Sequence, residues 1–211
     1  MPLNRRALVA AAMDLLDEKG AEALTMRNLA SRVDRKVASL YNHVSGRPEL
    51  VELIRAEIVA SIDTEPFAKD PWNVALERWA RSYGAAFGAH PASIRLLATT
   101  PIRDASTYVM YERVVDGLAR GGWPAGEAVA VMRTVEAFVL GAALDMIAPA
   151  DLLTPDAPAT DLPAIRRALA PEHATTSSAA AAFELGLTAL LDGLTERLAR
   201  LCEDRACSAG G

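Results

Sequence analysis

The side chains with the clearest chemical potential in this sequence lie around positions 27 to 47. This stretch contains five Lys or Arg residues and one acidic residue, which gives it a net charge of +4. Guanidinium, ammonium, hydroxyl, amide and imidazole groups can bond to phosphate oxygens and to the edges of bases. The candidates are Thr25, Arg27, Lys36, Ser39, Tyr41, Asn42, His43 and Arg47. The pattern indicates contact with nucleic acid, although a solvated helix face would carry the same charge.

The charge of the whole chain hides this local excess. The 211 residues have a net charge of −5, which taken alone argues against a nucleic-acid binder. Residues 1–62 have a net charge of +1, and the remaining residues have a net charge of −6. An acidic remainder would discourage indiscriminate adhesion to DNA and leave a local basic face for selective phosphate contact.

Catalytic and metal-binding groups form no recognisable pattern in the sequence. The three histidines, His43, His90 and His173, are far apart, and none adjoins an obvious nucleophile. The two cysteines, Cys202 and Cys207, exclude a disulfide framework and cannot build a zinc site without clustered histidines. No phosphate-binding loop or dinucleotide fingerprint occurs. We therefore expect a protein that is not an enzyme and that uses no metal or cofactor.

The location of the protein is also predicted from the sequence. Low cysteine use fits a reducing cytosol. No apolar run approaches the ~18 residues of a membrane span, and acidic residues interrupt the N-terminal apolar stretch, against a signal peptide. We expect a cytoplasmic protein without membrane contact.

The elements that position the polar residues are predicted to be helices, in an all-α fold. Hydrophobic residues make up 51% of the chain and aromatic residues only 5%, a composition that favours closely packed helices. Apolar residues recur at helical spacing from Leu8 to Leu16, and Gly20 ends this pattern. Thr25 is a natural N-cap for a second helix over residues 26–33.

A third helix is predicted over residues 37–44, with Leu40 and Val44 toward the core, and a fourth over residues 47–62. The second and third helices form a helix-turn-helix behind the first, so the N-terminal domain has three helices. The third helix would enter the major groove of DNA, and its outward side chains would meet the bases.

In this register, roughly residues 5–60 resemble the DNA-binding domain of the tetracycline-repressor (TetR) family of transcriptional regulators. The resemblance rests on LLDEKGAEALTMRNLASRV and SLYNHVSGRPELVELI. It implies DNA contact by Thr25, Arg27, Ser39, Tyr41, Asn42, His43 and Arg47. Asp34 replaces the usual turn glycine but tolerates a left-handed backbone, and Lys36 puts the cap of the third helix in doubt but adds a phosphate partner. Tyr41 could instead be a packing residue, His43 partly buried, and Asn42 simply exposed.

The resemblance implies a helix-turn-helix DNA-binding domain with a linking helix over 1–62, and a larger helical ligand-binding and dimerisation domain over 63–206. A flexible tail is predicted at 207–211, a hinge after Ile62 through Pro71, and a mobile or partly disordered loop at 149–163. Further helices are predicted near 72–89, 91–99, 104–121, 125–148, 162–170 and 177–205.

Homodimerisation is predicted through the helices near 125–148 and 177–205. Small residues such as Gly141, Gly186 and Ala189 would permit close approach. Leucines repeat along the last helix, namely Leu187, Leu190, Leu191, Leu194 and Leu198. The alternative is that both are ordinary core helices of a monomer.

A ligand pocket is predicted from aromatic, methionine and charged side chains on three helices. Its candidates are Trp79, Tyr83, Phe87, Tyr108, Tyr111, Met132, Arg133 and Glu136. An aromatic stripe at helical spacing is more often core than pocket. The intrusion of Arg133 and Glu136 into an apolar helix favours a pocket for a small, largely apolar molecule with one or two polar groups.

The sequence therefore predicts a homodimeric, ligand-responsive transcriptional regulator that binds double-stranded DNA. It would be a repressor that a small-molecule effector releases from a palindromic operator. The alternative is a ligand- or protein-binding helical module without specific DNA recognition.

Overall fold

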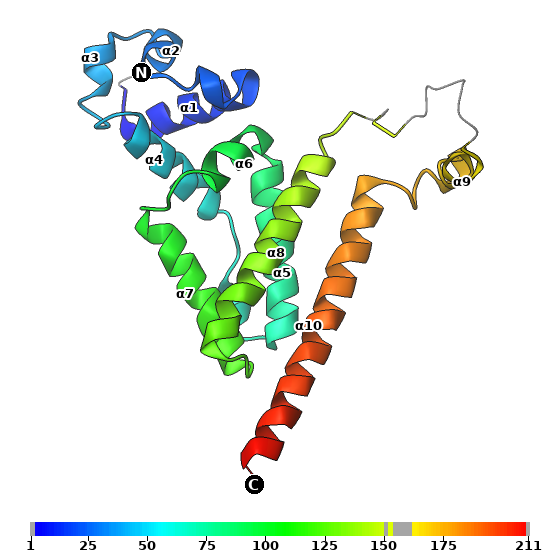
Figure 1. Cartoon of the computed structure of the whole chain (residues 1–211). Helices are drawn as coiled ribbons and strands as arrows, with labels where there is room; N and C mark the ends of the chain where they lie inside the picture. The colour runs from blue at the N-terminus through cyan, green and yellow to red at the C-terminus, as the bar shows by residue number, and fades with distance from the viewer. Residues whose placement is uncertain (1–2, 150–151, 154–161, 210–211) are drawn as a thin grey trace.

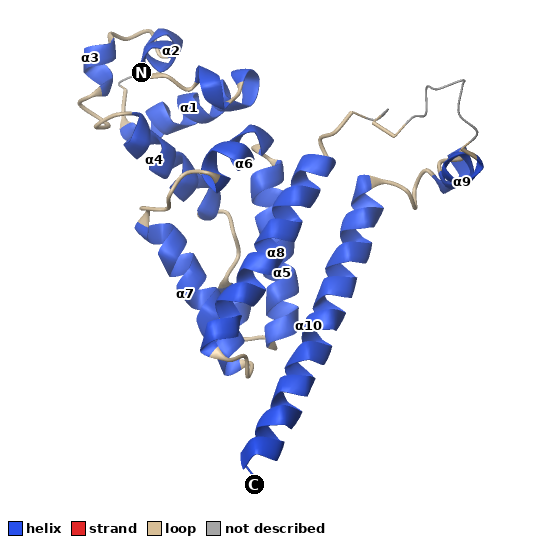
Figure 2. Ribbon diagram, in the orientation of Figure 1, coloured by secondary structure: helices blue, strands red, loops and turns tan. Residues whose placement is uncertain are grey.

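The structure, a computed structural model, describes residues 3–149, 152–153 and 162–209. In these residues all regular structure is helical, which confirms the predicted all-α class (Figure 2). The first four helices are α1 (Arg5–Lys19), α2 (Met26–Arg32), α3 (Val37–Leu40) and α4 (Arg47–Val59). The others are α5 (Trp72–Gly88), α6 (Pro91–Ala98), α7 (Ala105–Arg120), α8 (Ala125–Asp145), α9 (Pro163–Ala168) and α10 (Ala179–Ala209).

Side-chain caps fix where the N-terminal helices begin. The Asn4 side chain accepts a hydrogen bond from the Ala7 amide at the start of α1. Thr25 accepts one from the Asn28 amide, which confirms the predicted cap of α2. Asp34 has a φ of 50° in the turn before α3, the left-handed backbone expected of it.

Helix α3 is shorter than the predicted 37–44. Its α-helical turn ends at Leu40, and the backbone then tightens so that the amides of His43 and Val44 both donate to the Leu40 carbonyl. Lys36 occupies the N-cap without a side-chain bond, because an ammonium group has no acceptor to offer the free amides. A single uncapped turn depends on Leu40 and Val44, which are both buried.

The segment after Ile62, which the sequence predicts as a hinge, is folded and packed on the larger domain. Residues Glu65–Ala68 form a 3-10 turn that packs against α5 and α7, and Phe67 within it is buried. The Phe67 ring lies edge-on to Trp79 on α5, and Arg120 on α7 donates to the Phe67 carbonyl. Burial of this aromatic side chain fixes a segment whose prolines and charges suggested flexibility.

The larger domain is built around α5, which lies beside α8 and is flanked by α7 (Figure 1). Helix α10 packs on α8 and α5, where the Phe183 ring stacks on the Phe138 ring. The N-terminal domain contacts this body through α1, which meets α6, and through α4, which meets α5 and α7. His90 and Asp17 join the two parts at 2.7 Å.

The predicted tail at 207–211 and the predicted loop at 149–163 both lie at or beyond the limits of the described residues. Helix α10 continues to Ala209, so three residues of the predicted tail at 207–211 are helical and the last two lie outside the described residues. Most of the predicted loop at 149–163 also lies outside them. Within the described chain, no helix is long and apolar enough to cross a membrane.

Candidate functional site

The polar residues of α3 and its following turn are presented on the surface of the N-terminal domain. Tyr41 is 53% exposed and Asn42 is exposed, whereas Ser39 and His43 are half-buried. The opposite face of the turn is held to the core by Leu40 and Val44. The structure therefore brings Ser39, Tyr41, Asn42 and His43 together at one exposed end of the domain.

The cations around this surface are not equally available. Arg32 binds Glu18 through two bonds of 2.7 Å and lies 3.5 Å from Asp14, so its charge is neutralised within the chain. Arg27 and Lys36 are exposed, and neither makes an ion pair with any residue that the structure describes. These two side chains carry positive charge that a phosphate can use.

Arg47 and Thr25 both take part in the fold of the turn before α2. The Arg47 guanidinium donates to the Leu24 carbonyl at 2.9 Å and to the Ala21 carbonyl at 3.5 Å. Arg47 thereby holds the backbone at Leu24, the residue before the Thr25 cap, in place. Its predicted contact with a DNA phosphate stays a prediction.

A network missed by the sequence reasoning fixes the end of the α3 turn. Arg5 on α1 donates to the His43 carbonyl at 3.2 Å and to Glu49 on α4 at 3.0 Å. Glu49 in turn accepts a hydrogen bond from the Ser45 amide, and this bond, with the nearby Arg5, lowers the pKa of the Glu49 carboxyl. The network orients the surface that carries Tyr41.

A second candidate site is a cavity of about 500 Å³ in the larger domain. Five of the predicted ligand-binding residues line it, namely Tyr83, Phe87, Tyr111, Arg133 and Glu136. The rest of its wall is Arg55 from α4, residues 97–102 at the end of α6 and the following loop, and Ala137 and Leu140 from α8. The wall combines apolar and aromatic side chains with several polar groups, so it can hold a small molecule that also carries polar substituents.

Glu136 is the polar centre of this cavity. Its Oε1 accepts hydrogen bonds from the Tyr83 hydroxyl at 2.9 Å and from the Tyr111 hydroxyl at 2.7 Å. Burial raises the pKa of the Glu136 carboxyl. Burial, together with the nearby carboxylate, raises the pKa of both tyrosines, which keeps their hydroxyls protonated as donors.

The other three predicted ligand-binding residues do not reach the cavity wall. Trp79 is fully buried, edge-on to the Tyr83 ring at 5.2 Å between ring centres. Met132 is buried in the core, and Tyr108 is exposed and donates to the Ile102 carbonyl. Trp79 and Tyr108 thus contact wall residues.

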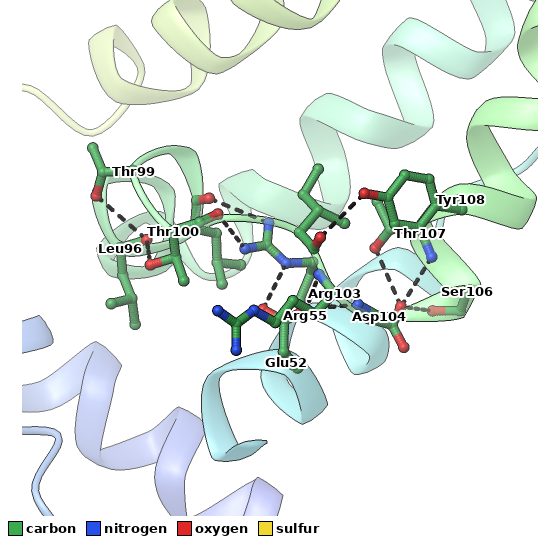
Figure 3. A network of polar contacts seen from close by, with 12 residues as sticks. Glu52, Arg55, Leu96, Thr99, Thr100, Arg103, Asp104, Ser106, Thr107 and Tyr108 are labelled. Atoms are coloured by element: carbon green, nitrogen blue, oxygen red, sulfur yellow. Dashed lines mark hydrogen bonds and ion pairs between the residues drawn. The ribbon is translucent and has the colours of Figure 1, made fainter. Parts of the chain in front are cut away.

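Arg55 and Glu52 of α4 bind the segment between α6 and α7 (Figure 3), and Arg55 also lines the cavity. The Arg55 side chain is only 6% exposed and donates to the carbonyls of Leu97 at 3.2 Å and Thr100 at 2.9 Å. Glu52 lies 3.4 Å from Arg55 and accepts hydrogen bonds from the amides of Arg103 and Asp104. The sequence reasoning missed both residues, although an arginine inside the apolar stripe of a helix was a visible signal.

The described residues contain no group of three or more His, Cys, Asp or Glu side chains that could hold a metal ion.

Comparison with known proteins covers both domains. Residues 8–54 match the family described as "Bacterial regulatory proteins, tetR family", and residues 65–198 match "Tetracyclin repressor-like, C-terminal domain". The class A tetracycline repressor from transposon 1721 of Escherichia coli is 30% identical over 203 residues, which cover 92% of each chain.

Two solved structures have the same fold along nearly the whole chain. ActR of Streptomyces coelicolor in complex with actinorhodin has a TM-score of 0.74 and 28% identity, and the match covers 94% of this chain and 99% of that one. A TetR variant from Acinetobacter baumannii AYE in complex with minocycline has a TM-score of 0.75 and 26% identity, covering 92% and 94%. The chain therefore belongs to the TetR family of ligand-responsive, DNA-binding transcriptional repressors.

Proposed function

We propose that this chain is a homodimeric repressor that a small, largely apolar effector releases from a palindromic operator. The position of α4 carries this proposal, because one helix belongs to the DNA-binding domain and also lines the cavity. Glu49 near its N-terminus belongs to the network that holds the α3 turn, and Arg55 lies on the cavity wall. Arg55 of α4 is bonded to residues 97 and 100, so a ligand that displaces these residues would also displace α4. The dimer population would then shift toward a conformation in which the two recognition surfaces have a different spacing or orientation.

Dimerisation is assigned to the outward faces of α8 and α10. Leu187, Leu194 and Leu198 are buried within their own chain, so they belong to the core of one protomer. The faces left exposed carry small and apolar residues at helical spacing. They are Ala130, Thr134, Ala137, Gly141 and Leu144 on α8, and Ala182, Leu185, Ala189 and Gly193 on α10.

These faces support a two-fold interface of closely approaching helices, with Leu185 as its most exposed apolar side chain at 74%. A two-fold dimer would place its two recognition surfaces about 34–36 Å apart, one turn of DNA.

On the DNA, Arg27 and Lys36 would bind phosphates, and Tyr41 and Asn42 are the most accessible groups for bases. Thr25, Ser39 and His43 would complete the contact surface, and Arg47 would hold the turn that presents Thr25.

The effector is proposed to be a small, largely apolar molecule. ActR in complex with actinorhodin and the Acinetobacter baumannii TetR variant in complex with minocycline show that proteins of this fold hold small molecules, and aromatic side chains line the cavity here. A regulator of this kind needs no catalytic activity, and it would work in the cytoplasm, where its operator lies.

A mobility-shift assay with the DNA upstream of its own gene tests the proposal. A specific, salt-sensitive complex with a palindrome is expected, and Tyr41→Ala should weaken it. Equal affinity for that DNA and for a scrambled duplex would instead support the alternative, a helical ligand- or protein-binding module without specific DNA recognition.

A further inference from the structure

We infer that the cavity selects an effector with a protonated amine on an aromatic frame, and that Glu136 binds the amine. This inference deepens the proposed function, since it assumes that the cavity is the effector site. It rests on the Glu136 oxygen that accepts no hydrogen bond, on the aromatic rings beside it, and on the charged side chains of the wall.

The Glu136 carboxyl has one oxygen to spare. Both tyrosine hydroxyls donate to Oε1, and no donor among the described residues reaches Oε2. Glu136 is half-buried, so its Oε2 stays open to a ligand, and a charged N–H donor would form a strong, charge-assisted hydrogen bond with it. An anionic ligand would add a second negative charge to the same space.

The rings next to Glu136 also suit a cation. Tyr83 and Phe87 stack with ring centres 4.9 Å apart, and Tyr111 reaches the same carboxylate from α7. The faces of aromatic rings attract cations and stack on flat aromatic frames, and the half-buried Tyr111 is more exposed for this than Tyr83 and Phe87, which are buried against one another. The carboxylate and rings together resemble the chemistry used elsewhere to bind organic ammonium groups.

The two arginines of the wall differ in how far they are available to a ligand. Arg55 already bonds to Glu52, Leu97 and Thr100, so its donors face the protein. Arg133 lies one turn before Glu136 on α8, is exposed and makes no ion pair with any described residue, and its charge lowers the pKa of Glu136 against the larger, raising effect of burial. The C-terminal end of α6, whose carbonyls carry partial negative charge, also borders the cavity.

Two acridine dyes of the same frame test this inference. The probes are 9-(aminomethyl)acridine, whose amine is protonated at neutral pH, and acridine-9-carboxylate, an anion. Fluorescence titration of the full chain without DNA should show that the amine binds at least about tenfold more tightly than the carboxylate. Glu136→Gln, which keeps an oxygen for both tyrosines, should weaken amine binding by about tenfold or more and leave carboxylate binding unchanged or tighter.

Glu184→Gln is the matched control, because Glu184 is an exposed carboxylate paired with Arg81 outside this cavity. It should leave both affinities unchanged, and thermal unfolding of each variant verifies its fold. Tighter binding of the carboxylate, no binding of the amine, or equal amine affinity in Glu136→Gln would each overturn the inference. Operator binding is measured separately in the mobility-shift assay. Absence of specific operator binding would contradict the proposed repressor, whereas absence of amine selectivity in the dye titration would contradict only the present inference.

Discussion

Arg55 and Glu52, three residues apart on α4, hold opposite ends of the connection between α6 and α7. Arg55 bonds to the carbonyls of Leu97 and Thr100, where α6 ends. Glu52 accepts from the amides of Arg103 and Asp104, where α7 begins. Because both side chains come from one turn of α4, that helix and the segment between α6 and α7 must move together or break these bonds.

Loss of Arg55 is expected to destabilise the protein strongly. Arg55→Ala would leave Glu52 and two carbonyls without their buried partner, and breaking a buried ion pair typically costs about 3–5 kcal/mol. Urea unfolding of the full chain measures the change. The control is Arg200→Ala, which removes an exposed ion pair with Glu196 and should cost no more than about 1 kcal/mol. Equal losses in the two variants would contradict the role assigned to Arg55.

The salt dependence of operator binding should distinguish the free cations from the paired one. Lys36→Gln and Arg27→Gln should each reduce the slope of log K against log salt concentration by about one unit, because each removes one phosphate contact. Arg32→Gln is the control on the same surface, because Glu18 and Asp14 already neutralise that guanidinium. Its slope should match that of the unchanged protein. If the slope falls equally in all three variants, Arg32 must break its ion pairs with Glu18 and Asp14 and contact a DNA phosphate instead.

The pH dependence of stability should reveal the burial of Glu136. Its folded-state pKa is raised above the ordinary value of 4.5, so the native state holds more protons than the unfolded state in the window above 4.5. The free energy of unfolding therefore falls as the pH rises through that window. Glu136→Gln should remove this decline, so its stability relative to the unchanged protein should increase from acidic to neutral pH in urea unfolding.

Glu184→Gln is the comparison variant, because the pKa of Glu184 is shifted in the opposite direction to that of Glu136. The hydrogen bond from Arg81 lowers the pKa of Glu184, so its stabilising contribution is present above the ordinary value and is lost as the pH falls through the folded one. The difference between the unchanged protein and Glu184→Gln should therefore shrink in acid. The same pH profile for both carboxylate variants would contradict the burial assigned to Glu136.

The parts of the site that the sequence predicts are those whose signals are local. The Thr25 cap and the buried pair Leu40 and Val44 lie within a few residues of the side chains that they position. Glu136 is likewise conspicuous as a carboxylate in an apolar helix. Such features depend on the spacing along one helix, which the sequence contains directly.

The residues that were missed have partners far away in the chain. Arg5 binds Glu49, and Arg55 binds carbonyls 42 and 45 residues away. Helical spacing also does not tell which neighbour a face meets, so Trp79 and Tyr83 share one stripe although only Tyr83 lines the cavity. Only the packing of α4, α5 and α8 decides these contacts.

The close contact between Gly117 and Phe67 offers a test of whether the segment after Ile62 acts as a hinge. A Cβ atom on Gly117 would lie 2.5 Å from Phe67 Cδ1 and 2.9 Å from its Cβ, so Gly117→Ala must push the 3-10 turn away from α7. We expect a loss of about 1–3 kcal/mol in the free energy of unfolding, as for other overpacked cores. Gly88→Ala is the control, because a Cβ there meets nothing within 4 Å, and alanine should stabilise the helix by up to about 1 kcal/mol. If Gly117→Ala is as stable as the control in urea unfolding, residues 63–71 yield freely, and the segment is the hinge that its composition suggested.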